Sequence, residues 1–181
     1  MDETYFGGKQ KNKPARERRK NNRQGVHTMT ATVGMKDRVV NEVRTKVVSN
    51  KSGPTLQGFV RDYAVPGAVL YTDEAKVYRK LGGEFIHEVV DHSVGQYVRG
   101  QAHINGMESF WAVLKRAHKG IYHKISPKHL HRYAGDFAGR HALRSLDTIN
   151  MLKALTAGMA GKRLCYRALI ADNGLPSGIR G

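Results

Sequence analysis

The chain has 181 residues, of which 31 are lysine or arginine and 15 are aspartate or glutamate, so its formal net charge is +16. This length and a 40% hydrophobic share suffice for one domain with a core, and no apolar run is long enough to span a membrane. The lone cysteine, Cys165, excludes an internal disulfide and a multi-cysteine zinc site within the chain. The polar start predicts no secretory signal, so we expect a basic protein of the reducing cytoplasm with a polyanionic partner, most simply nucleic acid.

The first part of the chain is predicted to contain strands separated by a basic arm. Asp2–Gly8 is typical of a strand end that turns into a loop at its two glycines. Residues 9–24 are rich in lysine and arginine and have no large apolar side chain, which predicts a solvated loop or arm. β-Branched residues in 26–35 and 38–49 favour two further strands, with Gly34–Asp37 as the turn between them.

Helices and strands alternate through the middle of the chain. Apolar side chains at helical spacing predict an amphipathic helix through Leu56, Phe59, Val60 and Tyr63. Residues 68–72 predict a short strand that ends at Asp73, a helix then leads to the glycines at 82 and 83, and residues 85–90 predict another strand.

The second half of the chain is predicted to be helical. A strong helix is expected from about Asn105 to Lys119, because its apolar residues follow a 3.6-residue period: Met107, Phe110, Trp111, Leu114 and Ala117. Ser126 and Pro127 predict the start of another helix. The order as a whole predicts an α/β fold with a mixed sheet flanked by helices. Residues 1–148 are assigned to this core, and residues 149–181 to a helical or irregular C-terminal tail.

Acidic residues are few in this basic chain, so their positions are informative. Asp73 follows a short apolar strand, and ligands bind near strand ends of this type in α/β sheets. Each acid also has a simpler interpretation, since an aspartate after a strand is commonly a turn former and a glutamate beside an apolar stripe, such as Glu108, is commonly solvated. Lys115 follows Glu108 by seven residues and shares its helix face, which suits a metal-binding carboxylate beside a phosphate-binding cation.

Four stretches resemble bacterial insertion-sequence transposases of the DDE type: DETYFGGK at 2–9, YTDEAKVY at 71–78, DHSVGQYVRGQAHINGMESFWAVLKR at 91–116 and YHKISPKHLHRY at 122–133. The resemblance extends to about Thr148 and is to the ISXO2-like branch, which joins an N-terminal zinc ribbon to an integrase-type core. It implies a ribonuclease-H-like fold, a mixed sheet flanked by helices, that cuts DNA and transfers the cut strand with Mg²⁺ or Mn²⁺ as the cofactor.

The resemblance also implies roles for single residues. Asp2, Asp73 and Glu108 would bind the metal ions, and Lys115 would be the basic residue that follows the third acid. Asn105 is the reserve candidate for the third acid, because an asparagine replaces that acid in part of the family.

The implied partners are the DNA of the element ends and the target DNA. Arg99, Lys115 and Arg116 are expected to contact DNA. A homodimer or larger assembly would hold two element ends together, in the bacterial cytoplasm at the nucleoid.

The start of the chain departs from the family pattern. Neither a zinc ribbon nor a leading strand precedes Asp2 in this sequence, so we expect an N-terminally truncated catalytic core. One alternative is an inactive remnant of the transposase that only binds DNA. Another is a basic RNA-binding or ribosome-associated protein, which explains the charge equally well but not the spacing of Asp73, Glu108 and Lys115.

Overall fold

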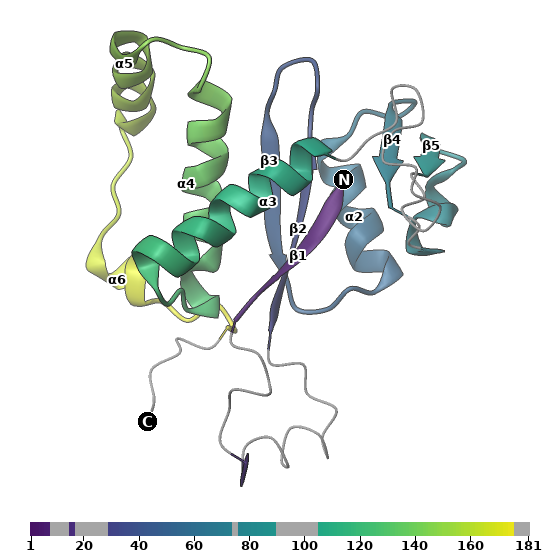
Figure 1. Ribbon diagram of the computed structural model, residues 1–181, viewed down its shortest axis with the longest axis horizontal. Coiled ribbons are helices and arrows are strands. Elements are labelled where there is room, and N and C mark those ends of the chain that lie inside the picture. Colours follow the sequence, from purple (N-terminus) through teal and green to yellow (C-terminus); the bar gives the residue numbers. More distant parts are fainter. Residues whose placement is uncertain (8–14, 17–28, 74–75, 90–104, 176–181) are drawn as a thin grey trace.

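The computed structural model describes residues 1–7, 15–16, 29–73, 76–89 and 105–175. The basic arm expected at 9–24 lies outside these ranges except for residues 15–16, and so do residues 90–104. Within the described ranges no helix is long and apolar enough to cross a membrane. The described elements follow the predicted order (Figure 1): β1 (Asp2–Phe6), β2 (Thr30–Lys36), β3 (Val43–Val48), α2 (Gly53–Tyr63), β4 (Val69–Thr72), the 3₁₀ helix η2 (Lys76–Leu81), β5 (Ile86–Val89), α3 (Asn105–Ala117), the π-helical turn η3 (His118–Tyr122), the 3₁₀ turn η4 (Pro127–His129), α4 (Leu130–Leu143), α5 (Thr148–Met159) and α6 (Tyr166–Ile170).

The strands form two small sheets. β1, β2 and β3 pair antiparallel in that order, whereas β4 and β5 pair parallel. A hydrogen bond of 2.7 Å, donated by the amino nitrogen of Met1 to the carbonyl oxygen of Tyr71, joins the first sheet to the second. We call this boundary between β1 and β4 the seam. The prediction of an α/β fold is confirmed. The single mixed sheet that was expected is not found among the described residues, where the antiparallel and the parallel strands belong to two separate sheets.

The three-stranded sheet has a hydrophobic core on each face. One core combines Met1 and residues of β2 and β3 with α2, β4 and η2, and includes Val33, Phe59 and Tyr78. The other combines Phe6 and Val43 with α3 and α4. Because the side chains of successive strand residues point to opposite faces, neighbouring residues of β1 serve different layers of the molecule.

The turn predicted at Gly34–Asp37 is wrong in its position. Gly34 lies inside β2, opposite Asp2 and Thr45, and the chain reverses later, between Asp37 and Glu42. A β carbon on Gly34 would lie 2.6 Å from both Met107 Cε and Trp111 Cζ2, so this glycine lets α3 approach the sheet closely.

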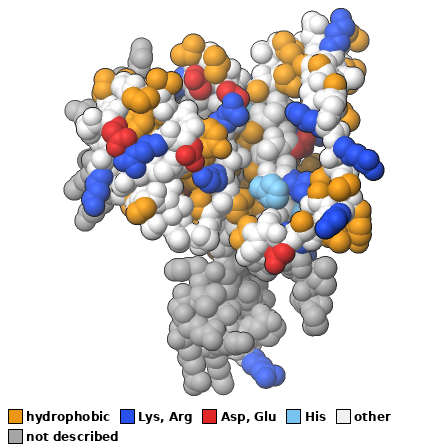
Figure 2. All heavy atoms as spheres, turned by 180° about the vertical axis from the view of Figure 1, so that it is seen from behind, with side chains coloured by type: hydrophobic (Ala, Val, Ile, Leu, Met, Phe, Trp, Pro, Cys, Tyr) orange, Lys and Arg blue, Asp and Glu red, His pale blue; other side chains and the backbone are white. Residues whose placement is uncertain are grey.

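The helices that were predicted from apolar periodicity are confirmed. The expected stripe of α3 is buried in full, including Trp111. In α2, Leu56, Phe59 and Val60 are buried as expected, but Tyr63 at the end of the helix is exposed. The C-terminal helices differ from these, since α5 buries no residue. Its apolar side chains are exposed on the surface: Ile149, Leu152, Leu155 and Met159. Hydrophobic side chains also lie in the open on the face that Figure 2 shows.

Candidate active site

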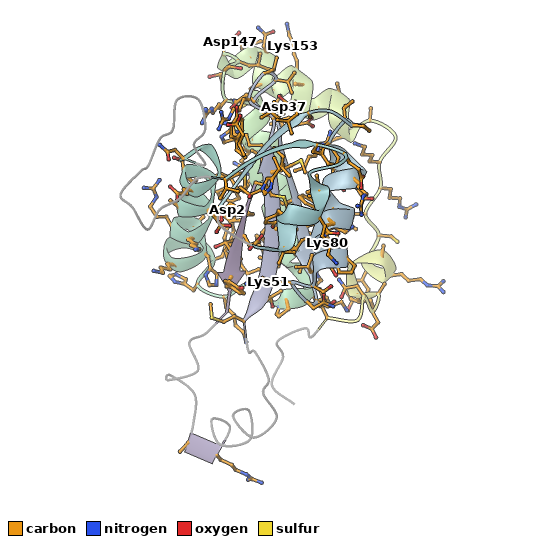
Figure 3. The ribbon with its side chains drawn as sticks, turned by 90° about the vertical axis from the view of Figure 1, so that its right-hand side faces the viewer. Asp2, Asp37, Lys51, Lys80, Asp147 and Lys153 are labelled. Atoms are coloured by element: carbon orange, nitrogen blue, oxygen red, sulfur yellow. The ribbon has the colours of Figure 1, made fainter. Side chains whose placement is uncertain are left out.

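Asp2 is positioned by β1 on the face of the sheet that α3 covers. It pairs with Gly34, whose missing side chain would point at Met107 and Trp111, and residues opposite each other in an antiparallel pair share a face. Figure 3 shows Asp2 in the interior, between α3 and the strands. Its Oδ1 accepts a 2.7 Å hydrogen bond from the backbone nitrogen of Glu3. Burial raises the pKa of the Asp2 carboxyl, this hydrogen bond lowers it, and the charge of Asp73 raises it further.

Asp73 directly follows β4, and the preceding residue anchors the end of that strand. Thr72 is fully buried, and its hydroxyl donates to the carbonyl oxygen of Asp73 over 2.8 Å. The same hydroxyl lies 2.8 Å from Nε2 of His87 on β5. Because a hydroxyl carries one proton, the His87 ring is the donor in this second bond. Burial lowers the pKa of His87, which keeps the ring neutral.

A second bridge crosses the seam on the opposite face. Glu3 pairs with Val33, so its side chain points towards α2 and η2. There its Oε1 accepts a hydrogen bond from the hydroxyl of Tyr78, which is 1% exposed. Burial raises the pKa of Tyr78 far above its usual range, and the Glu3 charge adds to the effect, so the hydroxyl stays protonated.

Two basic groups border the two aspartates. Burial lowers the pKa of the Met1 amine to about 6, and the charge of Arg38 lowers it too, whereas the charges of Asp2 and Asp73 raise it. The guanidinium of Arg38 lies over the ring of Tyr71, 4.1 Å from its centroid. The end of the β2–β3 hairpin therefore reaches across the seam to β4.

The candidates on α3 lie in a different environment. Asn105 and Glu108, in the first turn, are exposed, and so are Lys115 and Arg116 in the last turn. Among the described residues, no three acidic, histidine or cysteine side chains come close enough to hold a metal ion together. The structure therefore brings Asp2 and Asp73 within electrostatic reach of each other, without Glu108 as a third member. Arg99 lies outside the described residues.

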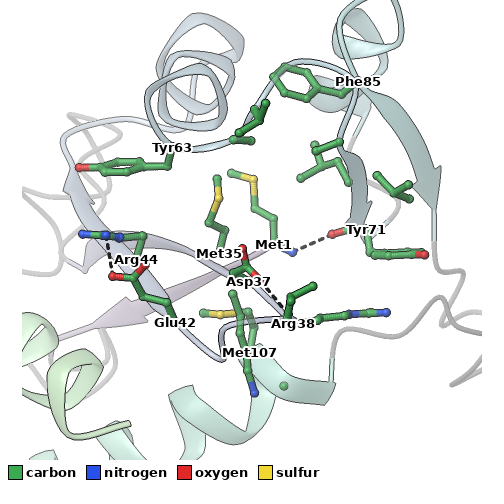
Figure 4. A pocket seen from close by; sticks show the side chains of 18 of the residues that line it. Met1, Met35, Asp37, Arg38, Glu42, Arg44, Tyr63, Tyr71, Phe85 and Met107 are labelled. Carbon is green, nitrogen blue, oxygen red and sulfur yellow. Dashed lines mark hydrogen bonds and ion pairs between the residues drawn. The ribbon is translucent and has the colours of Figure 1, made fainter. Parts of the chain in front are cut away.

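A cavity of about 740 Å³ opens beside Met1, between β2 and β4 (Figure 4). One wall is formed by Met35–Asp37, next to the N-terminal end of β1, and the other by Val69–Tyr71 of β4. Each of these segments has a strand partner on its far side only, since Lys36 pairs with Val43 and Val69 pairs with Ile86. Aromatic side chains and the start of α3 complete the lining, among them Tyr63, Phe85, Gly106 and Met107. The cavity therefore lies beside Met1 in the direction in which the register of β1 would continue.

The donor set at the seam fits a hard divalent cation in part. Asp2 and Asp73 supply the carboxylate oxygens that Mg²⁺ and Mn²⁺ prefer, and their mutual repulsion is the kind that a bound cation relieves. The described geometry supplies two such carboxylates rather than three.

Sequence reasoning did not single out Glu3, Tyr78, Thr72 or His87. Glu3 and Tyr78 both lie inside the stretches that carry the family resemblance. Glu3 directly follows Asp2, and Tyr78 comes five residues after Asp73. The alternation of side chains along β1 could have identified Glu3, because it places Glu3 on the face of the sheet opposite to that of Asp2.

Comparison with known proteins shows the family of the chain. The chain belongs to the family of ISXO2-like transposases, whose model matches residues 1–141. It is 30% identical over 119 residues to an uncharacterised transposase-like protein of Haemophilus influenzae, a match that covers 65% of this chain and 95% of that protein. No solved structure gives a significant match. The resemblance expected from the four sequence stretches is confirmed, and the family implies a transposase role with DNA as the partner.

Proposed function

We propose that this chain is the catalytic core of a DDE transposase, which cuts DNA at the ends of an insertion sequence and joins the cut strand to a target. The observation that carries the proposal is that Asp2 and Asp73, far apart in the sequence, lie close enough across the seam for their charges to interact. The order of strand pairings, β3–β2–β1 followed by β4–β5 beyond the seam, supports a ribonuclease-H-like sheet.

The chain's own residues have distinct tasks in this proposal. Asp2 and Asp73 hold the cation, with Glu108 of α3 as the third carboxylate and Asn105 in reserve. A bound Mg²⁺ or Mn²⁺ supplies the activation of water and the stabilisation of charge on the phosphate. Lys115 and Arg116 are exposed on α3, and together with Arg99 they would contact the DNA backbone. An assembly of two or more copies would hold the two ends.

The test is the nicking of supercoiled plasmid DNA by the purified chain in Mn²⁺, with Asp73→Asn beside it. Asp172→Asn is the matched control, because it makes the same change at an exposed site in the C-terminal tail. We expect metal-dependent nicks from the unchanged chain and from Asp172→Asn, and none from Asp73→Asn.

The competing function is DNA binding without cutting, which the exposure of Glu108 favours. Under this function no variant cuts, and Asp73→Asn binds DNA as tightly as the unchanged chain or more tightly, because a negative charge near the phosphates is lost. Binding that weakens steeply with salt would accompany both functions, so cutting is the decisive measurement.

A further inference from the structure

The hydrogen bond between Glu3 and Tyr78 lies directly behind the two aspartates. Glu3 is the neighbour of Asp2 in β1 and points to the opposite face. Tyr78 stands five residues after Asp73, in the helix η2. The bond therefore joins the chain segment that carries one aspartate to the segment that carries the other.

Both ends of this bond are held firmly by their surroundings. On one side, Glu3 belongs to a strand paired along its length with β2. On the other side, the buried ring of Tyr78 packs edge-on against His87, with centroids 6.3 Å apart. The amide nitrogen of Gln57 in α2 also donates to the carbonyl oxygen of Val77 over 2.8 Å, which fixes the backbone of η2. A bond between two rigid elements sets the distance between them.

Packing alone would not require a charged residue at the position of Glu3. Glu3 adds a third negative charge close to Asp2 and Asp73, and its charge is one of the causes that raise the pKa of Asp2. An apolar residue on this face would avoid that repulsion while filling the same layer as Val33. A carboxylate that accepts a hydrogen bond from a hydroxyl group instead gives a strong and directional interaction.

We propose that Glu3 and Tyr78 are positioning residues that hold Asp2 and Asp73 at the spacing needed to share a divalent cation. This inference rests on the proposed function, because it assigns the two residues to the same site. Neither residue touches the cation. Tyr78 acts through Glu3 and β1 on one aspartate, and through η2 on the other.

The experiment measures Mn²⁺ affinity by titration calorimetry on the full metal-free chain, together with the free energy of unfolding in urea. Tyr78→Phe removes the hydroxyl and keeps the ring, whereas Glu3→Gln keeps an acceptor oxygen and removes the charge. Tyr133→Phe is the matched control, since it removes one hydroxyl from a partly buried tyrosine in the other core. Asp73→Asn reports whether the binding measured belongs to the aspartate pair.

We expect Tyr78→Phe to weaken Mn²⁺ binding about tenfold, in the range seen when a partner of a metal ligand is removed. Glu3→Gln should weaken it less, and Tyr133→Phe should leave it unchanged. Unchanged Mn²⁺ affinity in Tyr78→Phe, with a lower free energy of unfolding, would overturn the inference and leave the pair a purely structural role. If Tyr78→Phe does not fold, unchanged affinity in Glu3→Gln overturns it equally. Failure of the proposed function has a different signature, in which the unchanged chain and Asp73→Asn bind Mn²⁺ alike or not at all.

Discussion

Gly34 of β2 and Met107 of α3 are in such close contact that a β carbon on the glycine would lie 2.6 Å from the Met107 methyl carbon. The ring of Trp111 lies at the same distance from that position. Because Gly34 is the strand partner of Asp2, this contact determines how closely the start of α3 approaches the first aspartate. The methionine end can rotate away from an added carbon, but the buried indole has nowhere to move.

Gly34→Ala is therefore expected to destabilise the protein by about 1–3 kcal/mol, the usual cost of overpacking a core. Urea unfolding measures the change. The matched control is Gly58→Ala in α2, where an added β carbon meets nothing within 4 Å, so it should be neutral or slightly stabilising. Equal stability of the two variants would contradict the close contact.

The exposed first turn of α3 holds two candidates for the third metal ligand, and single substitutions separate them. We expect Glu108→Gln to reduce plasmid nicking in Mn²⁺ by about a hundredfold or more, because misplacing a reacting group by about 1 Å already costs that much. Asn105→Ala should stay within a few-fold of the unchanged chain. The reverse pattern would make Asn105 the third ligand and Glu108 a solvated surface residue.

The Met1 amine predicts a pH dependence of stability. Its pKa is about 6 in the folded protein against an ordinary value of 8.0, so between pH 8 and pH 6 the unfolded chain takes up a proton that the folded chain does not. The free energy of unfolding should therefore decrease as the pH falls through this window, on the order of 2 kcal/mol in total. N-terminal acetylation removes the titrating group, so the acetylated chain should lack this part of the decrease. Identical pH profiles for the two chains would contradict the burial of the amine.

The cavity beside Met1 predicts that a short extension will stabilise the fold. Continuing the β1 register, the second residue before Met1 lies opposite Asp37, on the face of Tyr63 and Phe85. A Thr-Val-Thr extension joined to Met1 should place its valine there and raise the free energy of unfolding by about 1–2 kcal/mol.

The control for the extension is Thr-Asp-Thr, which has the same length but directs a charge towards the aromatic side chains. It should give no gain in urea unfolding. Equal gains from the two extensions would show that the added segment does not enter the cavity as a strand.

Elements governed by local pattern could be predicted from the sequence. The stripe of α3 is buried as expected because a 3.6-residue period leaves few other ways to hide five apolar side chains, and the strand before Asp73 was visible as a short apolar run. Gly34 was misassigned because glycine is typical of turns, whereas its position here is required by a helix more than seventy residues away.

Of the candidate site, the sequence predicted only the acidic residues proposed to bind metal, and their roles remain predictions. Nothing local in the sequence shows that Glu3 meets Tyr78, because that contact depends on the pairing of β1 and on the placement of η2. The exposure of Glu108 likewise depends on how α3 packs, which the sequence pattern left open beside the apolar stripe.

The seam has a mechanical consequence for the two aspartates. Asp2 belongs to the three-stranded sheet and Asp73 directly follows β4 of the two-stranded sheet, so the two carboxylates are attached to different sheets. A small rotation of one sheet against the other changes the separation of the two charges directly, whereas bending of the outer strands leaves it untouched. The hydrogen bonds of Met1 and Glu3, and the contact of Arg38 with the ring of Tyr71, connect the three-stranded sheet to β4 and η2. For the cation proposed at this pair, we therefore expect affinity to depend on the contacts that hold the two sheets together more than on the rotamers of the carboxylates.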